Sequence, residues 1–440
     1  MEQKFKRLCE LCFWLMLLLS PFLDMVNGIF TYVQAGGTGI GDMLSTLDLT
    51  DDGGLSPSLV IRMAFLALMV LYLFVCRHKK AILMFVCIGI AWVLTVGFEF
   101  VRGVEFSLFA DISYIIRFCY CLVCLVVGER IIRAGAGKFE LRERVDKLLC
   151  IAALTGALGI MLPFMFEMGF YTYADPLGYR GSRGFYYAGN DITVVLMLIL
   201  PLMLSSWMEG KGKPGLWAYL KLVCCAFSVV AMLVIGTKTS FLAVGFVGCV
   251  MLVYALIQGF RHKNWTPLIR LLIAVAVTYV VYVLFSAGAT VSQSIKTTKK
   301  YMDERDPGQS LLSGRTTYLI MAWHDLQETV PFSILAGVGR GSQEHIIEMD
   351  LCEVVLYYGA LGTVTMLWLY LKQGLKIIKG LFESFSLRNL ACCSALALCV
   401  GFLALAGHVL FSVTAGFYFA FFIVYTRMDC SKEGIEAKMI

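Results

Sequence analysis

Residues 216–259 read LWAYLKLVCCAFSVVAMLVIGTKTSFLAVGFVGCVMLVYALIQG, which is two apolar runs joined by the short polar turn GTKTS. Each run has about 20 residues, the length that a helix needs to cross a hydrocarbon layer of about 30 Å. Backbone groups find no water inside such a layer, so a crossing segment of this kind must be helical. The stretch therefore predicts two transmembrane helices.

Comparable runs recur along the 440 residues, of which 59% are hydrophobic and only 15% charged. A soluble domain is about one-quarter charged. We therefore expect an all-α, polytopic integral membrane protein with about 12 spans in one transmembrane domain, 1–440. The expected spans lie near 8–26, 55–76, 80–101, 108–128, 147–170, 189–208, 216–235, 240–259, 267–287, 351–371, 388–405 and 409–426.

Lys and Arg residues are unevenly shared between the two sets of connections. They gather near both termini and in the connections at 77–80, 130–147 and 372–388, and they are sparser in the alternating connections. Because basic residues favour the cytoplasmic side, both termini are expected in the cytoplasm. The net charge of +6 then reflects topology and indicates no nucleic-acid partner.

The longest connection, 287–350, is expected to lie outside, to be partly helical and to cover the active site. Its segment SGRTTYLIMAWHDLQETVPF, 313–332, offers Ser313 as an N-cap and Pro331 as a stop. Between them Leu319, Trp323 and Leu326 recur at helical spacing. The pattern predicts an amphipathic helix on the membrane surface.

Cations on the expected outer side fall in short motifs: YRGSRGFYYAGND (179–191), GTKTS (236–240), SGR (313–315) and GVGRGSQEHIIEMD (337–350). Guanidinium groups match phosphate oxygens through paired hydrogen bonds, and glycine-rich backbone lets an anion approach main-chain N–H groups. The predicted pyrophosphate-binding residues are Arg180, Arg183, Lys238, Arg315 and Arg340. For Arg180 and Arg183, contact with lipid headgroups is the alternative.

Glu348, Asp350 and His345 are the candidate catalytic residues, because a carboxylate or imidazole can deprotonate an attacking hydroxyl. Alternatively, the two carboxylates cap the following helix, and His345 is a surface histidine. No dense set of His, Cys and Asp occurs at metal-ligand spacing, so we expect no metal and no cofactor.

Three polar residues in or beside the spans, Arg62, Arg117 and Asn190, are candidates for lining a cavity. Charged residues inside a membrane are costly and are therefore functional candidates by default. For the two arginines the alternative is that their long side chains reach out to the interface.

The motifs between Arg180 and Gly362 resemble the superfamily of O-antigen polymerases and O-antigen ligases. Its members show an arginine-glycine segment before an Asn-bearing helix, a Thr/Ser turn, a Ser-Gly-Arg-like helix start, a Gly-x-Gly turn and a closing helix with Gly-x-x-Gly. The corresponding stretches are RGSRGFYYAGND, GTKTS, SGRTTYLIMAW, GVGRG and EMDLCEVVLYYGALG. The resemblance implies a membrane glycosyltransferase scaffold, GT-C-like, with the outer loop folded over a cavity.

Two departures bear on the branch of the superfamily. Ligases typically carry His-Asn eleven residues before the first glycine of the closing helix, and the same count from Gly359 reaches Glu348. An acidic residue there resembles the polymerase branch. In the Thr/Ser turn, Lys238 stands where an arginine is usual, and lysine offers a point charge without a planar fork.

The resemblance implies a glycosyltransferase of a bacterial plasma membrane that joins undecaprenyl-pyrophosphate-linked oligosaccharide repeats into an O-antigen, capsule or exopolysaccharide. Direct displacement by the acceptor hydroxyl should make it inverting, and the lack of a ligand cluster in the sequence makes it metal-independent. Membrane lipid, a flippase and a chain-length regulator are the expected partners. One alternative is a ligase that moves the finished glycan to a lipid or protein acceptor. Another is a transporter or flippase of lipid-linked sugars, whose polar site would lie near the bilayer midplane.

Overall fold

The computed structural model describes residues 2–34, 57–134, 139–173, 180–210, 214–304 and 315–429. Within these residues, eleven helices are long and apolar enough to cross a membrane, and a shorter apolar stretch, Val413–Thr426, follows them. The chain is thus an all-α, multi-pass membrane protein, as predicted. The elements are α1 (Glu2–Gln34), α2 (Pro57–Val75), α3 (Lys79–Arg102), α4 (Leu108–Ala134), α5 (Phe139–Met165), β1 (Phe170–Tyr173), β2 (Arg180–Gly184), α6 (Gly189–Met208), α7 (Leu216–Ile235), α8 (Lys238–His262), α9 (Thr266–Leu284), α10 (Gly288–Glu304), α12 (Arg315–Glu328), α13 (Phe332–Ala336), α14 (Asp350–Glu383), α15 (Leu387–Leu405) and α16 (Val413–Asp429).

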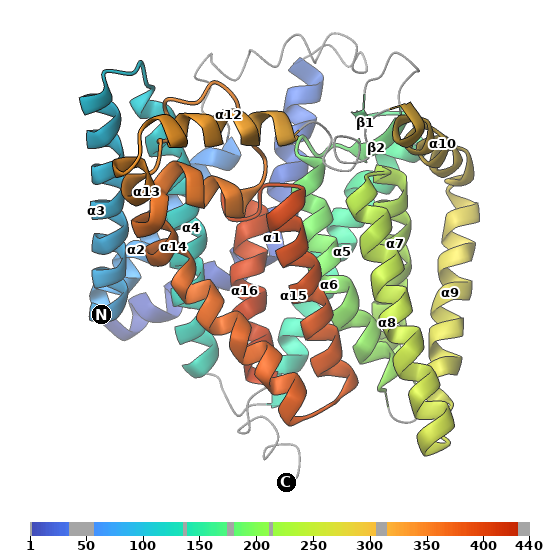
Figure 1. Cartoon of the computed structure of the whole chain (residues 1–440). Coiled ribbons are helices and arrows are strands. Elements are labelled where there is room, and N and C mark those ends of the chain that lie inside the picture. Colours follow the sequence, from blue (N-terminus) through green and yellow to red (C-terminus); the bar gives the residue numbers. More distant parts are fainter. Residues whose placement is uncertain are drawn as a thin grey trace.

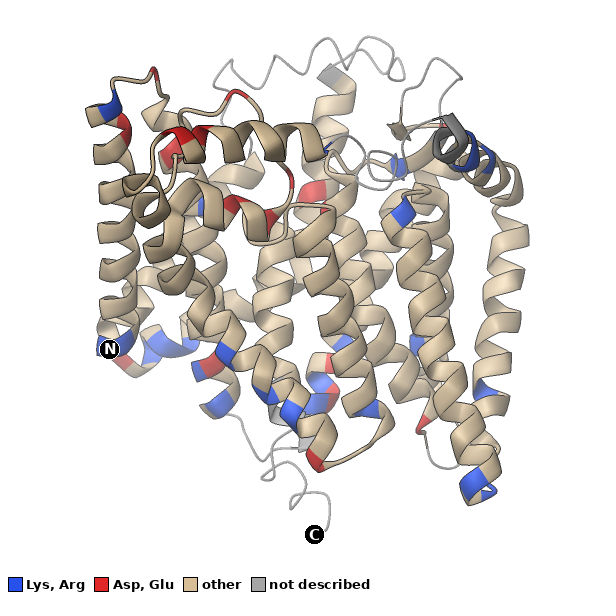
Figure 2. Ribbon diagram, in the orientation of Figure 1, with Lys and Arg blue, Asp and Glu red and all other residues tan. Residues whose placement is uncertain are grey.

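The long helices run side by side, with the β1–β2 hairpin, α10 and α12 at one end, which we call the hairpin end (Figure 1). The first residues of α1 and the last residues of α16 lie at the opposite end. Figure 2 shows that Lys and Arg residues gather chiefly at that opposite end. This distribution is the one that the positive-inside rule expects of a cytoplasmic side.

Side-chain exposure separates a central core from a lipid-facing rim. On α9, Leu272, Val275 and Tyr279 are 58, 59 and 66% exposed. Exposure of such large side chains costs free energy in water but not in lipid. In contrast, α6 is buried along almost its whole length. It lies among α5, α7, α15 and α16 and forms the centre of the bundle.

The hairpin was not predicted. Strands β1 and β2 pair antiparallel, with Tyr173 opposite Arg180, in a segment that the sequence analysis treated as a loop. Gly181 and Gly184 adopt positive φ, and a Cβ on either would lie 2.2 Å from a backbone oxygen of Ile235 or Gly159. Glycine is therefore required for the hairpin to sit directly on the ends of α7 and α5.

The long connection 287–350 carries three helices, α10, α12 and α13, in its described part, and Ser313 lies outside the described residues. Helix α12 occupies the predicted stretch, but it packs against α13 and α14 within the protein. Its buried residues are Ala322 and Leu326, whereas Trp323 is 50% exposed. The predicted apolar face was therefore partly wrong, because Trp323 lies about 100° around the helix from Ala322.

Helix α14 contains a kink at Gly359, where φ is 60° and ψ is −163°. The turn after α13 fits into this kink: Val338 N donates to Leu356 O at 2.9 Å and Gly339 N to Tyr357 O at 3.0 Å. A Cβ on Gly359 would meet the backbone of Leu335 at 2.5 Å. The glycines of GVG and of YYGALG thus allow two backbones to touch.

Helix α16 begins at Val413, so the predicted span 409–426 started too early. The Asp350 carboxylate accepts hydrogen bonds from Val409 N at 2.5 Å and Leu410 N at 2.6 Å, which removes these amides from helical pairing. Ser412 Oγ then caps the helix by accepting from Ala415 N at 3.1 Å. Residues 407–412 form a non-helical stretch between two apolar helices.

A closed group of charges lies at the opposite end of the bundle. Arg388 on α15 contacts Asp146 of α5 at 3.1 Å and also donates to Tyr425 of α16, while Lys221 of α7 lies 3.7 Å from Asp146. We call these four residues the α15 cluster. The side chains of Arg388 and Asp146 are only 1 and 5% exposed.

Candidate functional site

The long connection brings Arg315 and Glu348 together, 33 residues apart in the chain. Arg315 Nε and Nη2 both donate to Glu348 Oε2, at 3.1 and 2.6 Å. Arg315 is the first residue of α12, and Glu348 precedes α14 with a positive φ of 60°. Such a backbone conformation is strained for a residue with a Cβ. The Glu348 side chain is 46% exposed and therefore accessible from outside the bundle.

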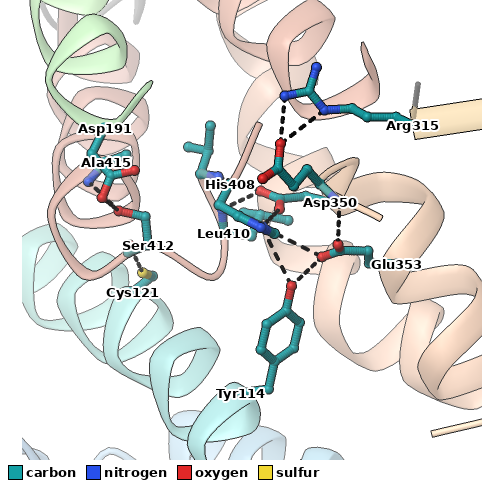
Figure 3. Close-up of polar contacts among 12 residues, drawn as sticks. Tyr114, Cys121, Asp191, Arg315, Asp350, Glu353, His408, Leu410, Ser412 and Ala415 are labelled. Carbon is teal, nitrogen blue, oxygen red and sulfur yellow. Dashed lines mark hydrogen bonds and ion pairs between the residues drawn. The ribbon is translucent and has the colours of Figure 1, made fainter. Parts of the chain in front are cut away.

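Beneath this pair, four side chains from three segments meet (Figure 3). His408 Nδ1 lies 3.2 Å from Asp350 Oδ1, 3.4 Å from the Tyr114 hydroxyl and 3.7 Å from Glu353 Oε2. The Tyr114 hydroxyl donates to Glu353, which also accepts from Glu348 N at 2.8 Å. We call Tyr114, Arg315, Glu348, Asp350, Glu353 and His408 the α14 cluster.

His408 carries a positive charge in this setting. Its burial disfavours the charged ring, but the hydrogen bond with Asp350 and the charges of Glu353, Asp350 and Glu348 outweigh burial and raise the pKa of His408 to about 9. The imidazole is therefore protonated at neutral pH. Its side chain remains 27% exposed.

Arg340 lies beside the cluster. Its guanidinium sits over the Tyr114 ring, 5.9 Å from the centroid, and donates to Gln343 O. The turn around it is held by buried acids: Asp111 accepts from Arg340 N and Gly341 N at 3.1 Å each, and Glu99 accepts from Ser342 N at 3.0 Å. These amides are thus already bound within the protein, so the expectation that they receive an anion was wrong for this turn.

A second group of predicted residues lies at the hairpin. Arg183 on β2 stacks on Phe170 and Tyr187, at 5.4 and 5.7 Å, and donates to Tyr187 O at 2.5 Å. Burial lowers the pKa of Arg183, and its Nε is buried with no hydrogen-bond partner among the described residues. Arg180 pairs through its backbone with Tyr173.

The Thr/Ser turn adjoins the hairpin. Gly236 ends α7, Thr237 caps α8 by accepting from Ser240 N at 3.1 Å, and the partly buried Lys238 is the first residue of α8. A Cβ on Gly236 would lie 3.6 Å from the Cα of Gly181, so the turn and the hairpin are direct neighbours. Two of the predicted motifs therefore meet in space.

A family model described as O-antigen ligase like membrane protein matches residues 3–303 and 288–433 of the chain. The protein belongs to this family. No curated protein matches the chain. The O-antigen ligase-like family supports a role in membrane glycan assembly, and it agrees with a glycosyltransferase-like enzyme.

The remaining predicted residues of this O-antigen ligase-like protein lie apart from the α14 cluster. Arg62 on α2 contacts Asp24 of α1 at 2.5 Å and Thr414 of α16 at 2.7 Å, so it is tied to the protein interior. Arg117 is exposed on α4, and Asn190 is partly buried in the first turn of α6. His345 is exposed, with its ring 4.7 Å from that of Tyr318.

Asp350, Glu353 and His408 lie close enough to share a metal ion, with ligand atoms within 4.8 Å of one another. Their polar atoms already satisfy each other, however. Asp350 accepts two backbone amides and faces His408, and Glu353 accepts from Tyr114 and from Glu348 N. The donor set is complete as an internal hydrogen-bonded network, so we assign no metal to it.

His408, Tyr114 and Glu353 were missed by the sequence analysis. Tyr114 and Glu353 fall within predicted spans, where single polar residues are usually structural. The signal that was available for His408 is the Gly-His pair 407–408, which separates two apolar runs in LALAGHVLFS. A glycine followed by a titratable residue between two spans marks a break in the helix that lines or borders a site.

Proposed function

We propose that the protein is a polymerase that elongates a glycan on the outer face of a bacterial plasma membrane, using undecaprenyl-pyrophosphate-linked oligosaccharide repeats. The family match supports glycan assembly in a membrane. The observation that carries the finer proposal is the accessible Arg315–Glu348 pair, because it joins an anion-binding group to a carboxylate in one exposed place. The basic residues at the opposite end support an outward-facing hairpin end (Figure 2).

The pair suggests how the reaction begins. Two of the three guanidinium nitrogens of Arg315, Nε and Nη2, donate to one oxygen of Glu348. A diphosphate carries more charge than a carboxylate and accepts guanidinium hydrogen bonds in a bidentate manner. We infer that the donor diphosphate takes over Arg315, and that Glu348 is thereby released to accept a proton.

The bond changes follow from these roles. The acceptor hydroxyl oxygen attacks the anomeric carbon of the donor as Glu348 removes its proton, and the bond from that carbon to the diphosphate oxygen breaks. The electron pair leaves with the diphosphate, which Arg315 and Arg340 stabilise. Direct displacement inverts the anomeric centre.

The hairpin group supplies a second binding region for the same donor. The buried Nε of Arg183, which has no hydrogen-bond partner in the part of the chain that the structure describes, is a donor that an anionic oxygen would satisfy. Arg180 and Lys238 come from the two neighbouring motifs, and we assign them to the donor as well. His345 and Asp350 receive no catalytic step here. The ring of His345 packs against that of Tyr318, and Asp350 is fully buried and holds backbone amides.

A ligase that transfers the finished glycan is the second candidate, and the description of the family favours it. The products separate the two functions. Purified protein in lipid nanodiscs, given lipid-linked repeats, should yield a ladder of increasing repeat number if it is a polymerase. A single capped species that forms only when a lipid or protein acceptor is added would replace our proposal with the ligase.

The site assignment is tested in the same assay. Glu348→Gln keeps the shape and the hydrogen bond to Arg315 but cannot accept a proton, so elongation should fall by a factor of about 100 or more. Arg315→Ala should also abolish the ladder. Lys299→Ala, an exposed lysine on α10, is the matched control and should elongate normally. Full elongation by both site variants would discard these roles.

A further inference from the structure

The non-helical stretch 407–412 holds one charged side chain, His408, whose function none of the steps above requires. Its backbone is fixed from α14, because the Asp350 carboxylate binds the amides of Val409 and Leu410. The far end of the stretch is fixed from α6, because Ser412 Oγ donates to Asp191 at 2.6 Å. A loop tied at both ends by buried carboxylates holds its side chain in one place.

The His408 ring is oriented by its surroundings. The Nδ1 edge faces three oxygens, those of Asp350, Glu353 and Tyr114, at 3.2 to 3.7 Å. The Tyr114 ring meets the imidazole edge-on, with an interplanar angle of 89°. Among the described residues, Nε2 makes no hydrogen bond, and the side chain keeps 27% of its surface exposed. Nε2 is therefore the ring nitrogen that remains for a ligand.

The surroundings of His408 suit a positively charged hydrogen-bond donor better than a general base. Two carboxylates beside Nδ1 hold the proton of the ring, so the ring gives up a proton poorly. A carboxylate that fixes one nitrogen and leaves the other directed outward is a common way of orienting a functional histidine. Two further cations lie around the same tyrosine and glutamates, Arg340 over the Tyr114 ring and Arg315 on Glu348.

We propose that His408 is a binding residue for the donor diphosphate, with its Nε2–H donating a charge-assisted hydrogen bond to a diphosphate oxygen while Asp350 and Tyr114 position the ring. This inference rests on the proposed function, since it places the leaving group beside Glu348 and Arg315. It adds a third cation, 58 residues after the first residue of α14, to the two arginines of the outer connection.

The first test measures binding alone. Undecaprenyl pyrophosphate is titrated into the full-length protein in nanodiscs, for the wild type, His408→Gln and His408→Asn. Loss of one charge-assisted hydrogen bond should weaken binding about tenfold or more at pH 7. The matched control is His324→Gln, because His324 is an exposed histidine of α12 whose ion pair is with Glu328, and its affinity should equal that of the wild type. Wild-type affinity in both His408 variants would overturn the inference.

The second test needs no variant. The groups that face His408 from the elements packed around it are Tyr114, Asp191, Glu348, Asp350, Glu353 and, over Tyr114, Arg340. With His408 losing its proton near pH 9, the affinity of the wild type for undecaprenyl pyrophosphate should fall between about pH 8 and pH 10. His408→Gln should show a flat profile over that range. The same fall in wild type and variant would contradict the role of His408.

Elongation by the same preparations separates this inference from the proposed function. If wild type builds a ladder while His408→Gln elongates and binds as wild type does, the His408 assignment falls and the polymerase stands. If wild type builds no ladder from lipid-linked repeats but its diphosphate affinity depends on His408, the polymerase falls and the binding residue stands.

Discussion

The two charged clusters of the bundle differ in how far they are closed. In the α15 cluster the side chains of Arg388 and Asp146 are 1 and 5% exposed, and the ion pairs join three helices, α5, α7 and α15. In the α14 cluster three carboxylates gather around His408 and Arg315, and Glu348 is 46% exposed. Closed, balanced charges hold helices in register, whereas open charges next to a break in a helix are available to a ligand.

The largest effect is expected from Arg388→Met. It removes the cation closest to the buried Asp146 carboxylate and leaves Lys221 at the longer distance of 3.7 Å. Removing one member of a buried pair costs about 3–5 kcal/mol, so thermal unfolding in detergent should occur at a much lower temperature. The double variant Arg388→Met/Asp146→Leu should regain most of the loss. A single variant as stable as the wild type would show that the α15 cluster does not hold the helices.

A smaller loss of stability is expected from Asp350→Asn. Val409 N and Leu410 N donate to one oxygen, Oδ2, and the Asn carbonyl oxygen that replaces it carries no charge. The Asn NH2 group then takes the place of Oδ1 beside His408, so charged hydrogen bonds worth about 1.5–3 kcal/mol are replaced by weaker neutral ones. The free energy of unfolding measures this. Asp325→Asn, where the carboxylate accepts from Gln343 near the surface, is the control and should change stability little. Equal losses in both variants would remove the special role given to the 407–412 stretch.

Arg315→Lys should lower the rate of elongation about tenfold while leaving the unfolding temperature unchanged. Lysine keeps the charge but not the two parallel N–H groups that Arg315 directs at Glu348 Oε2. The matched control is Arg261→Lys in the last turn of α8, at the opposite end of the bundle. A normal rate for Arg315→Lys would mean that a point charge is sufficient and that bidentate binding plays no part.

The smallest effect concerns pH. The folded-state pKa of His408 is about 9, above the value of about 6.5 for a free histidine. The stability that its charge contributes is therefore complete below about pH 6.5 and is lost as pH rises through about 9. The gap in unfolding temperature between wild type and His408→Gln should be widest near pH 6 and should vanish near pH 10. A constant gap would show that packing, and not charge, accounts for it.

The transmembrane fold was predictable because hydrophobic length is a local property of the sequence. The start of α16 was not, because the apolar run continues through Val409 and Leu410. Asp350, 59 residues earlier in the chain, binds the Val409 amide and keeps this residue out of α16. No local sequence pattern indicates that contact. The hairpin was not predicted for a related reason: its two short strands depend on the contacts of Gly181 with α7 and of Gly184 with α5.

The candidate site was predictable only where its residues are charged and lie outside the apolar spans. Arg315 and Glu348 drew attention as charges in the long outer connection, and the structure joins them. Tyr114 looks ordinary inside an apolar helix, and its partner Glu353 is 239 residues away. Pairings over such distances come from the packing of α4 on α14 and α16, which a single sequence does not reveal.

The backbone contact between the turn 337–339 and the kink of α14 has a consequence for how this protein can vary. With Gly337, Gly339 and Gly359 in direct main-chain contact, no residue can be inserted or deleted between 337 and 359 without shifting Glu348 relative to α14. Helix α12 is under no such constraint on its exposed side. Substitutions on the outward surface of α12 are therefore expected to be tolerated, whereas substitutions at these three glycines are not.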